Sequence, residues 1–379
     1  MKILHIIYTT GVSGAENHLL DLLPELQKFD IDCELLCICP QKNFKSLQQY
    51  CRQMNEKGIK ATLLTTRSRM AFLFTAKRIA RYLKSNYIHI VHSHLFNGDL
   101  IAVLVKKFYF KKLVILSTKH GYEEKYLIQY GQGNKKISYN LYYFIARSVI
   151  KKIDHNLAVS RAISEMYAVL KLGKNKMKYI DHGINTELFQ QEQAQIEGDP
   201  KILMVGRLSE MKGHTYLIQA LPEIIQKFPN LKLIVLGNGP LKVELLKQAS
   251  GLHVLRHIEF VGFAKPNKYI SQCQLMILPS LFEPFGLVYI ESFALKIPVI
   301  TFDVEAGNQI IEDNETGFLV PYKNSKALAG KIIYLLQSPD ERKRIIKNAY
   351  NKYLTYYNVG RMAKETTEWY HSILMTGKE

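Results

Sequence analysis

The chain has 379 residues, a formal net charge of +18 and 47% hydrophobic residues. This length favours two domains, and the hydrophobic content is ample for a buried core in each. No stretch approaches the roughly 18 apolar residues of a transmembrane helix. The apolar run Lys2–Ile7 (KILHII) is too short for a signal peptide and predicts a first β-strand. The five scattered cysteines favour reduced, buried thiols and a cytoplasmic protein.

Strand-like runs alternate with helical stretches through the first half of the chain. The expected strands are Lys2–Ile7, Cys33–Ile38, Ala61–Leu64, Ile88–His92, Leu113–Thr118, His155–Val159 and Met177–Ile180. Helical spacing occurs between them, at Ala15–Lys28, Met70–Lys84, Leu95–Phe108 and Ser138–Lys151. Alternation of this kind predicts an α/β fold with a parallel, doubly wound sheet. Ligands of such sheets bind at the carboxyl ends of the strands.

The pattern restarts after a polar segment, residues 190–200 (QQEQAQIEGDP). The expected strands of the second half are Ile202–Val205, Lys232–Leu236, Glu259–Gly262, Leu275–Leu278, Pro298–Thr301 and Phe318–Val320. Pro339–Met375 is helical twice, and its last helix is expected to return to the first domain. We therefore predict two Rossmann-like domains facing a central cleft. The first spans 1–185 plus a C-terminal helix at about 357–379, and the second spans 186–356.

The positive charge is concentrated in the first half. Residues 1–190 contain 29 Lys/Arg and 14 Asp/Glu, a net charge of +15, whereas residues 191–379 carry only +3. Aromatic residues accompany these cations in Lys106–Lys112 (KKFYFKK) and in the helix that Lys135, Lys136, Arg147, Lys151 and Lys152 flank. Basic and aromatic residues together favour contact with an anionic membrane surface. An ordinary amphipathic helix and a nucleic-acid patch are the alternatives.

Leu278–Glu291 (LPSLFEPFGLVYIE) combines the end of a strand, a loop and the start of a helix expected at Phe285–Leu295. Pro284 suits the start of that helix, whose free amide groups and positive dipole would accommodate a phosphate. Glu283 lies before this phosphate position, and Glu291 lies inside the helix. Two carboxylates on either side of a diphosphate suit a ligand with hydroxyl groups at both ends, such as a nucleoside-diphosphate sugar.

Further loops follow expected strands in both halves. Gly206–Gly213 (GRLSEMKG) offers Arg207 and Lys212 as partners for diphosphate oxygens, with a solvated surface loop as the alternative. Gly237–Pro240 (GNGP) predicts a tight turn near the nucleotide, in which Gly237 and Gly239 permit close approach and Pro240 starts a helix. Val261–Phe263 (VGF) ends the next strand, where its backbone could face a base.

In the first half, Gly11–Glu16 (GVSGAE) opens the first helix, and its glycines could face phosphate or form a plain turn. His120 follows a strand and is expected to point into the cleft. His92 and His94 could hold a metal, but no third ligand is obvious, so structural or acceptor-side roles are favoured. Asp30 and Asp32 form a D-x-D pair before a strand, on the wrong edge for a ligand.

Taken together, these motifs resemble the GT-B retaining glycosyltransferases of family 4 over nearly the whole chain. Glu283 and Glu291 match the family's E-x7-E motif, and GRLSEMKG matches its G-R-x(3–4)-K-G loop. SGAE matches the N-terminal G-G-x-E, and Asn314–Pro321 (NETGFLVP) matches a strand with the pattern xTGxLv. Two segments depart from the family pattern: Asp181–Asn185 (DHGIN) and Glu305–Ile311 (EAGNQII).

The resemblance implies a role for each matched position. Glu283 would hold sugar hydroxyls, Glu291 the ribose hydroxyls, and Arg207 and Lys212 the departing diphosphate. The backbone amides of Phe285, Gly286 and Leu287 would bind sugar and phosphate. Gly14 would approach the phosphate, and His120 would contact the sugar near its 6-position.

The resemblance also implies retaining, metal-independent transfer without a cofactor. The expected donor is a UDP- or GDP-sugar. The expected acceptor is a membrane-linked glycan or lipid of the lipopolysaccharide, capsule or glycolipid type. We expect a cytoplasmic protein, peripheral on the inner face of the membrane, with no nucleic-acid partner. A GT-B sugar-nucleotide epimerase and a basic nucleic-acid-binding protein are the alternatives.

Overall fold

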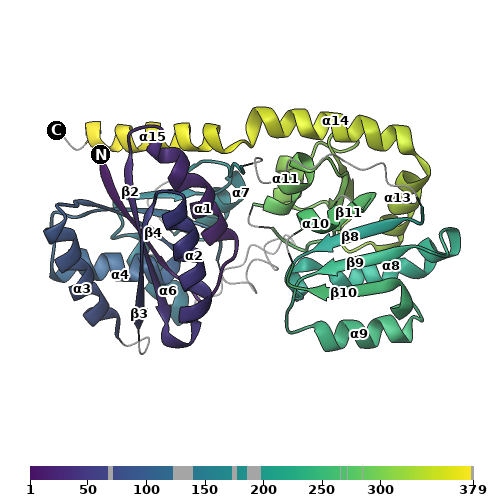
Figure 1. The fold of residues 1–379 in the computed structure, drawn as a ribbon, viewed down its shortest axis with the longest axis horizontal. Helices are drawn as coiled ribbons and strands as arrows, with labels where there is room; N and C mark the ends of the chain where they lie inside the picture. Colours follow the sequence, from purple (N-terminus) through teal and green to yellow (C-terminus); the bar gives the residue numbers. More distant parts are fainter. Residues whose placement is uncertain are drawn as a thin grey trace. The chain divides into compact units, whose positions relative to one another are not determined.

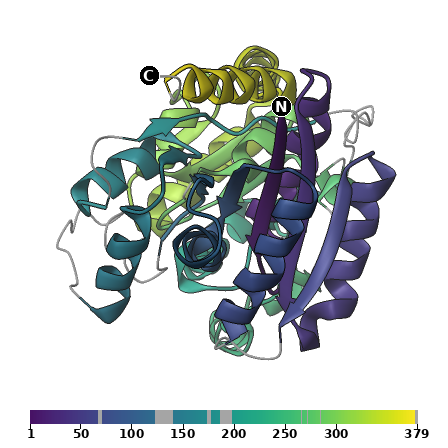
Figure 2. The same cartoon turned by 90° about the vertical axis from the view of Figure 1, so that its left-hand side faces the viewer.

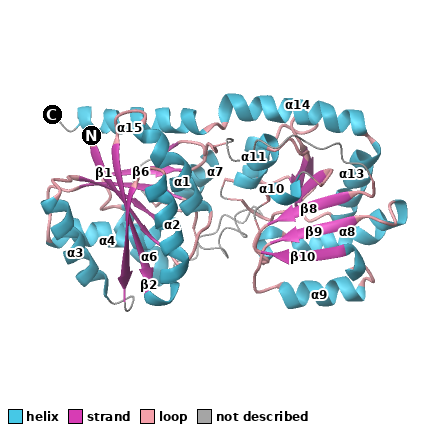
Figure 3. Ribbon diagram, in the orientation of Figure 1, coloured by secondary structure: helices cyan, strands magenta, loops and turns pink. Residues whose placement is uncertain are grey.

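A computed structural model describes residues 1–66, 71–122, 140–172, 177–185, 198–264, 266–270, 272–283 and 285–376. The chain divides into two compact units. Unit 1 comprises Met1–Gly121, Lys136–Ile184 and Val359–Glu379, and unit 2 comprises Tyr122–Lys135 and Asn185–Asn358. Each unit is built on one parallel sheet with helices packed against it (Figures 1 and 3). The predicted α/β class with two doubly wound sheets is therefore confirmed.

Unit 1 contains a seven-stranded sheet in the order β3-β2-β1-β4-β5-β6-β7. Its strands are β1 Lys2–Tyr8, β2 Asp32–Pro40, β3 Lys60–Thr66, β4 Ile90–His94, β5 Val114–Lys119, β6 His155–Ala158 and β7 Lys178–Tyr179. Its helices are α1 Gly14–Gln27, α2 Phe44–Glu56, α3 Phe72–Ser85, α4 Leu95–Phe108, α6 Leu141–Ile150, α7 Arg161–Val169 and α15 Val359–Thr376. The strand order reverses between β1 and β4, which makes this the switch point of the sheet.

The two faces of this sheet carry different side chains, because successive residues of a strand point to opposite sides. Ile3, Ile7 and Ile90 pack with residues of α1, α2 and α15. Leu4, Ile6 and Val91 pack with residues of α3 and α4. The C-terminal helix α15 packs against α1, close to the N-terminal strand (Figures 1 and 2). Residues from the two ends of the chain therefore share one core.

Unit 2 contains a six-stranded sheet in the order β10-β9-β8-β11-β12-β13. Its strands are β8 Lys201–Val205, β9 Lys232–Leu236, β10 Ile258–Gly262, β11 Leu275–Leu278, β12 Val299–Phe302 and β13 Phe318–Val320. Its α-helices are α8 His214–Lys227, α9 Lys242–Gly251, α10 Asn267–Ile270, α11 Leu287–Ala294, α12 Glu305–Ile310, α13 Ser325–Gln337 and α14 Pro339–Tyr356. Here the switch point lies between β8 and β11.

Two helix starts differ from the predictions. The helix expected from Phe285 begins at Leu287, because Gly286 takes a left-handed conformation with φ 95° and serves as its N-cap. The helix expected from Pro240 begins at Lys242, after a turn. Pro284, which was expected at a helix start, lies outside the described residues, as do Lys135 and Lys136 of the basic and aromatic stretch.

Candidate active site

Two loops meet at the switch point of unit 2, one after β8 and one after β11. Lys212 Nζ lies 2.6 Å from Glu283 Oε1, and Ser280 Oγ donates a hydrogen bond of 2.7 Å to the same oxygen. Glu283 is only 8% exposed, so its charge needs this compensation. The structure thus joins two residues that the sequence placed in separate motifs, 71 positions apart.

Gly213 explains how these two loops come so close. It adopts a left-handed conformation with φ 69°, and a Cβ atom at this position would lie 1.8 Å from the carbonyl oxygen of Pro279. Only glycine satisfies both the backbone angle and the approach. Gly213 therefore allows the β8 loop to pack against Pro279 at the start of the β11 loop. Glu283 lies four residues further along that loop.

Arg207 lies at the start of the same β8 loop and is exposed. Among the described residues, no carboxylate lies within ion-pair distance of its guanidinium group. The loop backbone is held by the neighbouring turn, since Leu208 N donates to Asn238 O over 3.1 Å. Arg207 is thus a cation without a described ion-pair partner at the carboxyl edge of the sheet, where ligands of such folds bind.

Gly237 and Gly239 have a packing role. A Cβ atom on Gly237 would lie 1.9 Å from Gly206 O, and one on Gly239 would lie 2.3 Å from Leu208 O. The turn after β9 therefore packs directly on the loop that carries Arg207. Whether these two glycines also approach a nucleotide stays a prediction.

The β11 loop leads into α11 through Gly286. A Cβ atom on Gly286 would lie 2.3 Å from the ring of Tyr289, whose hydroxyl group is 2.9 Å from Thr301 Oγ1. Leu287 begins the helix, so its amide belongs to the first turn, where N–H groups have no partner within the helix. Phe285 is buried just before this turn. Glu291 is half-buried on the same helix, one turn further along.

The loop after β10 places an aromatic side chain at the same edge of the sheet. Phe263 is 84% exposed, whereas Val261 is half-buried. Gly262 O accepts a hydrogen bond of 2.8 Å from Gly237 N, which connects this loop to the β9 turn. An exposed ring at the carboxyl end of a strand is available to stack on a flat ligand group.

In unit 1, Gly14 is the exposed first residue of α1. Ser13 N and Ser13 Oγ both donate to Glu16 Oε2 over 2.8 Å, so the buried Glu16 organises the turn before the helix. This gives Glu16 of the SGAE motif a structural role at the switch point of the sheet. The amide groups of the first turn of α1 remain directed along the helix axis, as an anion site requires.

His120 follows β5 and belongs to a group of six histidines that the sequence did not show as a group. The others are His5, His18, His92, His94 and His182. His94 Nδ1 lies 3.2 Å from His120 Nε2, and His94 Nε2 lies 3.1 Å from His5 Nδ1. His18 Nδ1 lies 2.8 Å from His182 Nδ1. Burial lowers the pKa of each ring, to about 3 for His5 and His18, so the rings are neutral near pH 7.

His5 supplies the third potential metal ligand that the sequence did not reveal beside His92 and His94. Their ligand atoms all lie within 4.8 Å of one another. However, His92 already bonds the Tyr370 hydroxyl group and Thr118 Oγ1, each over 2.7 Å. A metal ion at about 2.0–2.1 Å from each nitrogen would require these rings to move and to lose hydrogen bonds. The group is therefore a hydrogen-bonded cluster rather than a preformed metal site. His5 and His92 lie opposite each other because β1 and β4 are neighbouring strands in this register.

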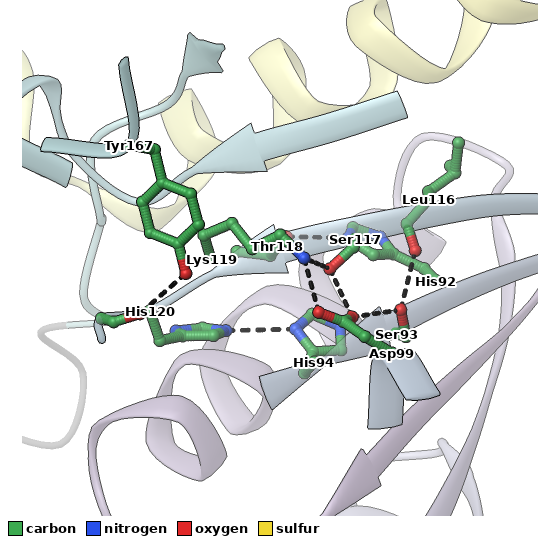
Figure 4. Close-up of polar contacts among 11 residues, drawn as sticks. His92, Ser93, His94, Asp99, Leu116, Ser117, Thr118, Lys119, His120 and Tyr167 are labelled. Carbon is green, nitrogen blue, oxygen red and sulfur yellow. Dashed lines mark hydrogen bonds and ion pairs between the residues drawn. The ribbon is translucent and has the colours of Figure 1, made fainter. Parts of the chain in front are cut away.

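The opposite face of β4 and β5 carries a second polar group (Figure 4). Asp99 Oδ1 accepts hydrogen bonds from Ser93 Oγ over 2.7 Å and Ser117 Oγ over 2.6 Å, and Asp99 Oδ2 pairs with Lys119 Nζ. All four side chains are buried. Lys119 immediately precedes His120, so this ion pair anchors the backbone from which the His120 ring projects. Sequence patterns did not single out this pair.

Two family models match the chain. The model described as Glycosyltransferase Family 4 matches residues 12–188, and the model described as Glycosyl transferases group 1 matches residues 185–352. An uncharacterized glycosyltransferase of Methanocaldococcus jannaschii is 30% identical over 230 residues, which are 56% of this chain and 59% of that protein. The phosphatidyl-myo-inositol mannosyltransferase of Mycobacterium leprae is 27% identical over 254 residues, 65% of this chain and 66% of that protein. These alignments thus span roughly three-fifths to two-thirds of each relative's length.

Among solved structures, HepE of Anabaena in complex with UDP-glucose superposes with a TM-score of 0.80 at 18% identity. The superposition covers 98% of this chain and 100% of HepE. This likeness shows the fold, which is that of the GT-B glycosyltransferases. With the two family models covering consecutive parts of it, the chain belongs to the family 4, group 1 glycosyltransferases.

Proposed function

We propose that this protein is a glycosyltransferase that binds a nucleoside-diphosphate sugar at the switch point of unit 2 and transfers the sugar to an acceptor hydroxyl group. The observation that carries this proposal is the Lys212–Glu283 pair at the edge of the sheet that also holds Arg207, which has no ion-pair partner among the described residues, and the first turn of α11. A departing diphosphate develops negative charge, and fixed cations and amide groups stabilise it. The UDP-glucose complex of HepE supports a UDP-sugar as donor.

The finer features of the reaction are proposals that rest on the family resemblance. Glu283 would hold sugar hydroxyls through Oε2, since Oε1 already receives hydrogen bonds from Lys212 and Ser280. Glu291 would hold the ribose. Transfer would retain the anomeric configuration and would need no metal, with Arg207 and Lys212 supplying the positive charge. The roles expected of Gly14 at a phosphate and of His120 at a sugar stay predictions from the same resemblance.

A thermal-shift series with UDP-, GDP- and ADP-sugars tests the donor site. A donor at 100 times its Kd adds about 2.7 kcal/mol to the free energy of unfolding, so one series should raise the Tm clearly. Glu283→Ala should abolish the dependence on the sugar while some response to the bare nucleotide diphosphate persists. Glu244→Ala, at an exposed position of α9 in the same unit, is the control. A Glu283→Ala protein that responds to sugar nucleotides like the wild type would overturn the assignment.

We also propose that the acceptor is lipid-linked and that unit 1 binds an anionic membrane surface. Its α6 exposes Leu141 (76%), Phe144 (54%) and Ile145 (41%), and the end of α4 exposes Phe108 (53%). A cavity of about 890 Å³ lies at the amino ends of the neighbouring strands and is lined by Lys106, Lys107, Lys151, Lys152 and Lys178, among others. Its one acidic lining residue, Asp154, is already paired with Lys106.

A relative's name gives the membrane proposal further support. The name of the Mycobacterium leprae relative indicates a lipid acceptor for that protein. No helix in the described part of the chain is long and apolar enough to span a bilayer. Attachment would therefore rest on cations and shallow apolar contact, and we place it at the inner face of the plasma membrane.

Vesicle flotation tests this attachment. Replacing Lys107, Lys151, Lys152 and Lys178 with glutamine should weaken binding to phosphatidylglycerol vesicles on the order of 10²- to 10³-fold at low salt, because each lysine near the surface contributes about 1 kcal/mol. The same change at the exposed lysines 42, 45, 77 and 84 of unit 1 keeps the net charge equal and should have a much smaller effect. Equal binding by the two variants, or none by the wild type, would refute the proposal.

A further inference from the structure

A continuous line of polar side chains crosses unit 1 from β2 to the end of β5. Cys33 Sγ lies 3.8 Å from His5 Nε2, and His5 Nδ1 lies 3.1 Å from His94 Nε2. His94 Nδ1 in turn lies 3.2 Å from His120 Nε2 (Figure 4). Cys33, His5 and His94 are at most 2% exposed. Among the described residues, His120 Nδ1 has no hydrogen-bond partner, so this atom is the open end of the line.

Neutral rings linked in this way cannot choose their tautomers independently. A neutral imidazole has one N–H donor and one acceptor nitrogen, so a proton placed on one ring dictates the proton position on the next. The line therefore has two states. In one, each group donates toward His120, which then carries its proton on Nδ1. In the other, each donates toward Cys33, and His120 Nδ1 is a bare acceptor.

The Cys33 end decides between the two states. Burial raises the pKa of the Cys33 thiol to about 12, so it keeps its proton. A thiol donating to an imidazole nitrogen satisfies a strong acceptor, whereas an imidazole N–H donating to sulfur finds only a weak one. The state in which donors point toward His120 is therefore the more stable.

We propose that His94, backed by His5 and Cys33, is a positioning residue that holds His120 as the tautomer with its proton on Nδ1. His120 then presents a hydrogen-bond donor at the carboxyl edge of the sheet. An oxygen atom of the sugar substrate accepts this hydrogen bond. That last step rests on the proposed function, whereas the tautomer itself does not.

The alternation of side chains along β4 explains why His94 contacts His120. His92 and His94 share one face of the strand, but only His94 is near enough to the end of β4 to reach His120 beyond the end of β5. His92 bonds Tyr370 of α15 and Thr118 instead. The two histidines are therefore equally buried but have different hydrogen-bond partners. His92 can serve as the control for substitutions of His94.

Long-range ¹H–¹⁵N spectra of the full-length protein labelled with ¹⁵N-histidine test the proposal directly. We expect a protonated Nδ1 and an unprotonated Nε2 for His120 in the wild type. His94→Phe should remove this bias, and His120 should shift toward the Nε2–H form that free histidine favours. His94→Asn should retain it, because the asparagine amide nitrogen lies where Nδ1 donates. His92→Phe, equally buried, should leave the His120 signals unchanged.

Turnover of the donor provides the second readout. His94→Phe should turn over UDP-glucose, or whichever sugar nucleotide stabilises the protein, about tenfold more slowly than His94→Asn, the size expected for one lost hydrogen bond to substrate. A wild-type His120 protonated on Nε2 would overturn the proposal even if no variant folded. So would a His120 tautomer that ignores His94→Phe. A correct tautomer in a protein without transferase activity would refute the proposed function alone.

Discussion

Arg207→Ala is expected to lower kcat/KM for sugar-nucleotide turnover about 10²- to 10³-fold, the effect of removing one fixed charge from a developing anion. The stability of the protein should hardly change, since the guanidinium group is exposed and makes no ion pair with a described residue. This combination distinguishes Arg207 from Lys212. Loss of Lys212 would leave the buried Glu283 carboxylate uncompensated and cost several kcal/mol of stability as well.

The measurement is initial-rate kinetics with UDP-glucose and the donor identified by thermal shift, together with urea unfolding. Arg256→Ala serves as the matched control, because Arg256 is an exposed arginine of unit 2 that precedes β10, at the amino edge of the sheet. Its kinetics should equal those of the wild type. If Arg207→Ala kept wild-type turnover, the diphosphate would have to be neutralised elsewhere, and the placement of the donor would be wrong.

Mild acid is expected to unfold unit 1. His5, His18, His92, His94 and His182 are at most 6% exposed, and burial lowers the pKa of each below its unfolded value of 6.5. Below pH 6.5 the unfolded chain therefore binds protons that the folded chain does not. The stability contributed by these neutral rings is complete above about pH 6.5 and is lost as pH falls toward 3.

Two carboxyl groups oppose this loss. Burial raises the pKa of Asp21 to about 7 and of Asp181 to about 6, so these groups are protonated in the folded protein before they are in the unfolded chain. With His120, whose pKa burial also lowers, six histidines against two aspartates leave a net uptake of about four protons on unfolding, or roughly 5 kcal/mol per pH unit. Because a folded domain is stable by only about 5–15 kcal/mol, unfolding should occur within a few pH units below 6.5.

Urea unfolding followed by circular dichroism between pH 7.5 and 5.0 measures this slope. His92→Phe should reduce the slope by about one proton, whereas replacing the exposed His253 by phenylalanine should leave it unchanged. A free energy of unfolding that stays constant from pH 7 to pH 5 would contradict the prediction. It would mean that the rings are protonated, or hydrated, in the folded protein.

The sequence alone was sufficient for the fold class and for most elements, because parallel strands buried on both faces appear as apolar runs separated by helical spacing. β9, β11, β13 and α4 have the predicted bounds. The helix starts at Leu287 and Lys242 were missed, since they depend on backbone angles at Gly286 and on a turn that continues past Pro240. Local patterns do not encode such angles strongly.

The sequence also determined the chemical types of the candidate donor site, because its motifs follow strand ends, where ligands of such sheets bind. Only the tertiary structure decided which of these residues touch. Lys212 reaches Glu283 because β8 and β11 are neighbours in space and Gly213 allows their loops to meet. Likewise, His5, His92, His94 and His120 came together only once β1, β4 and β5 lay side by side. Strand order is a long-range property, and no local spacing specifies it.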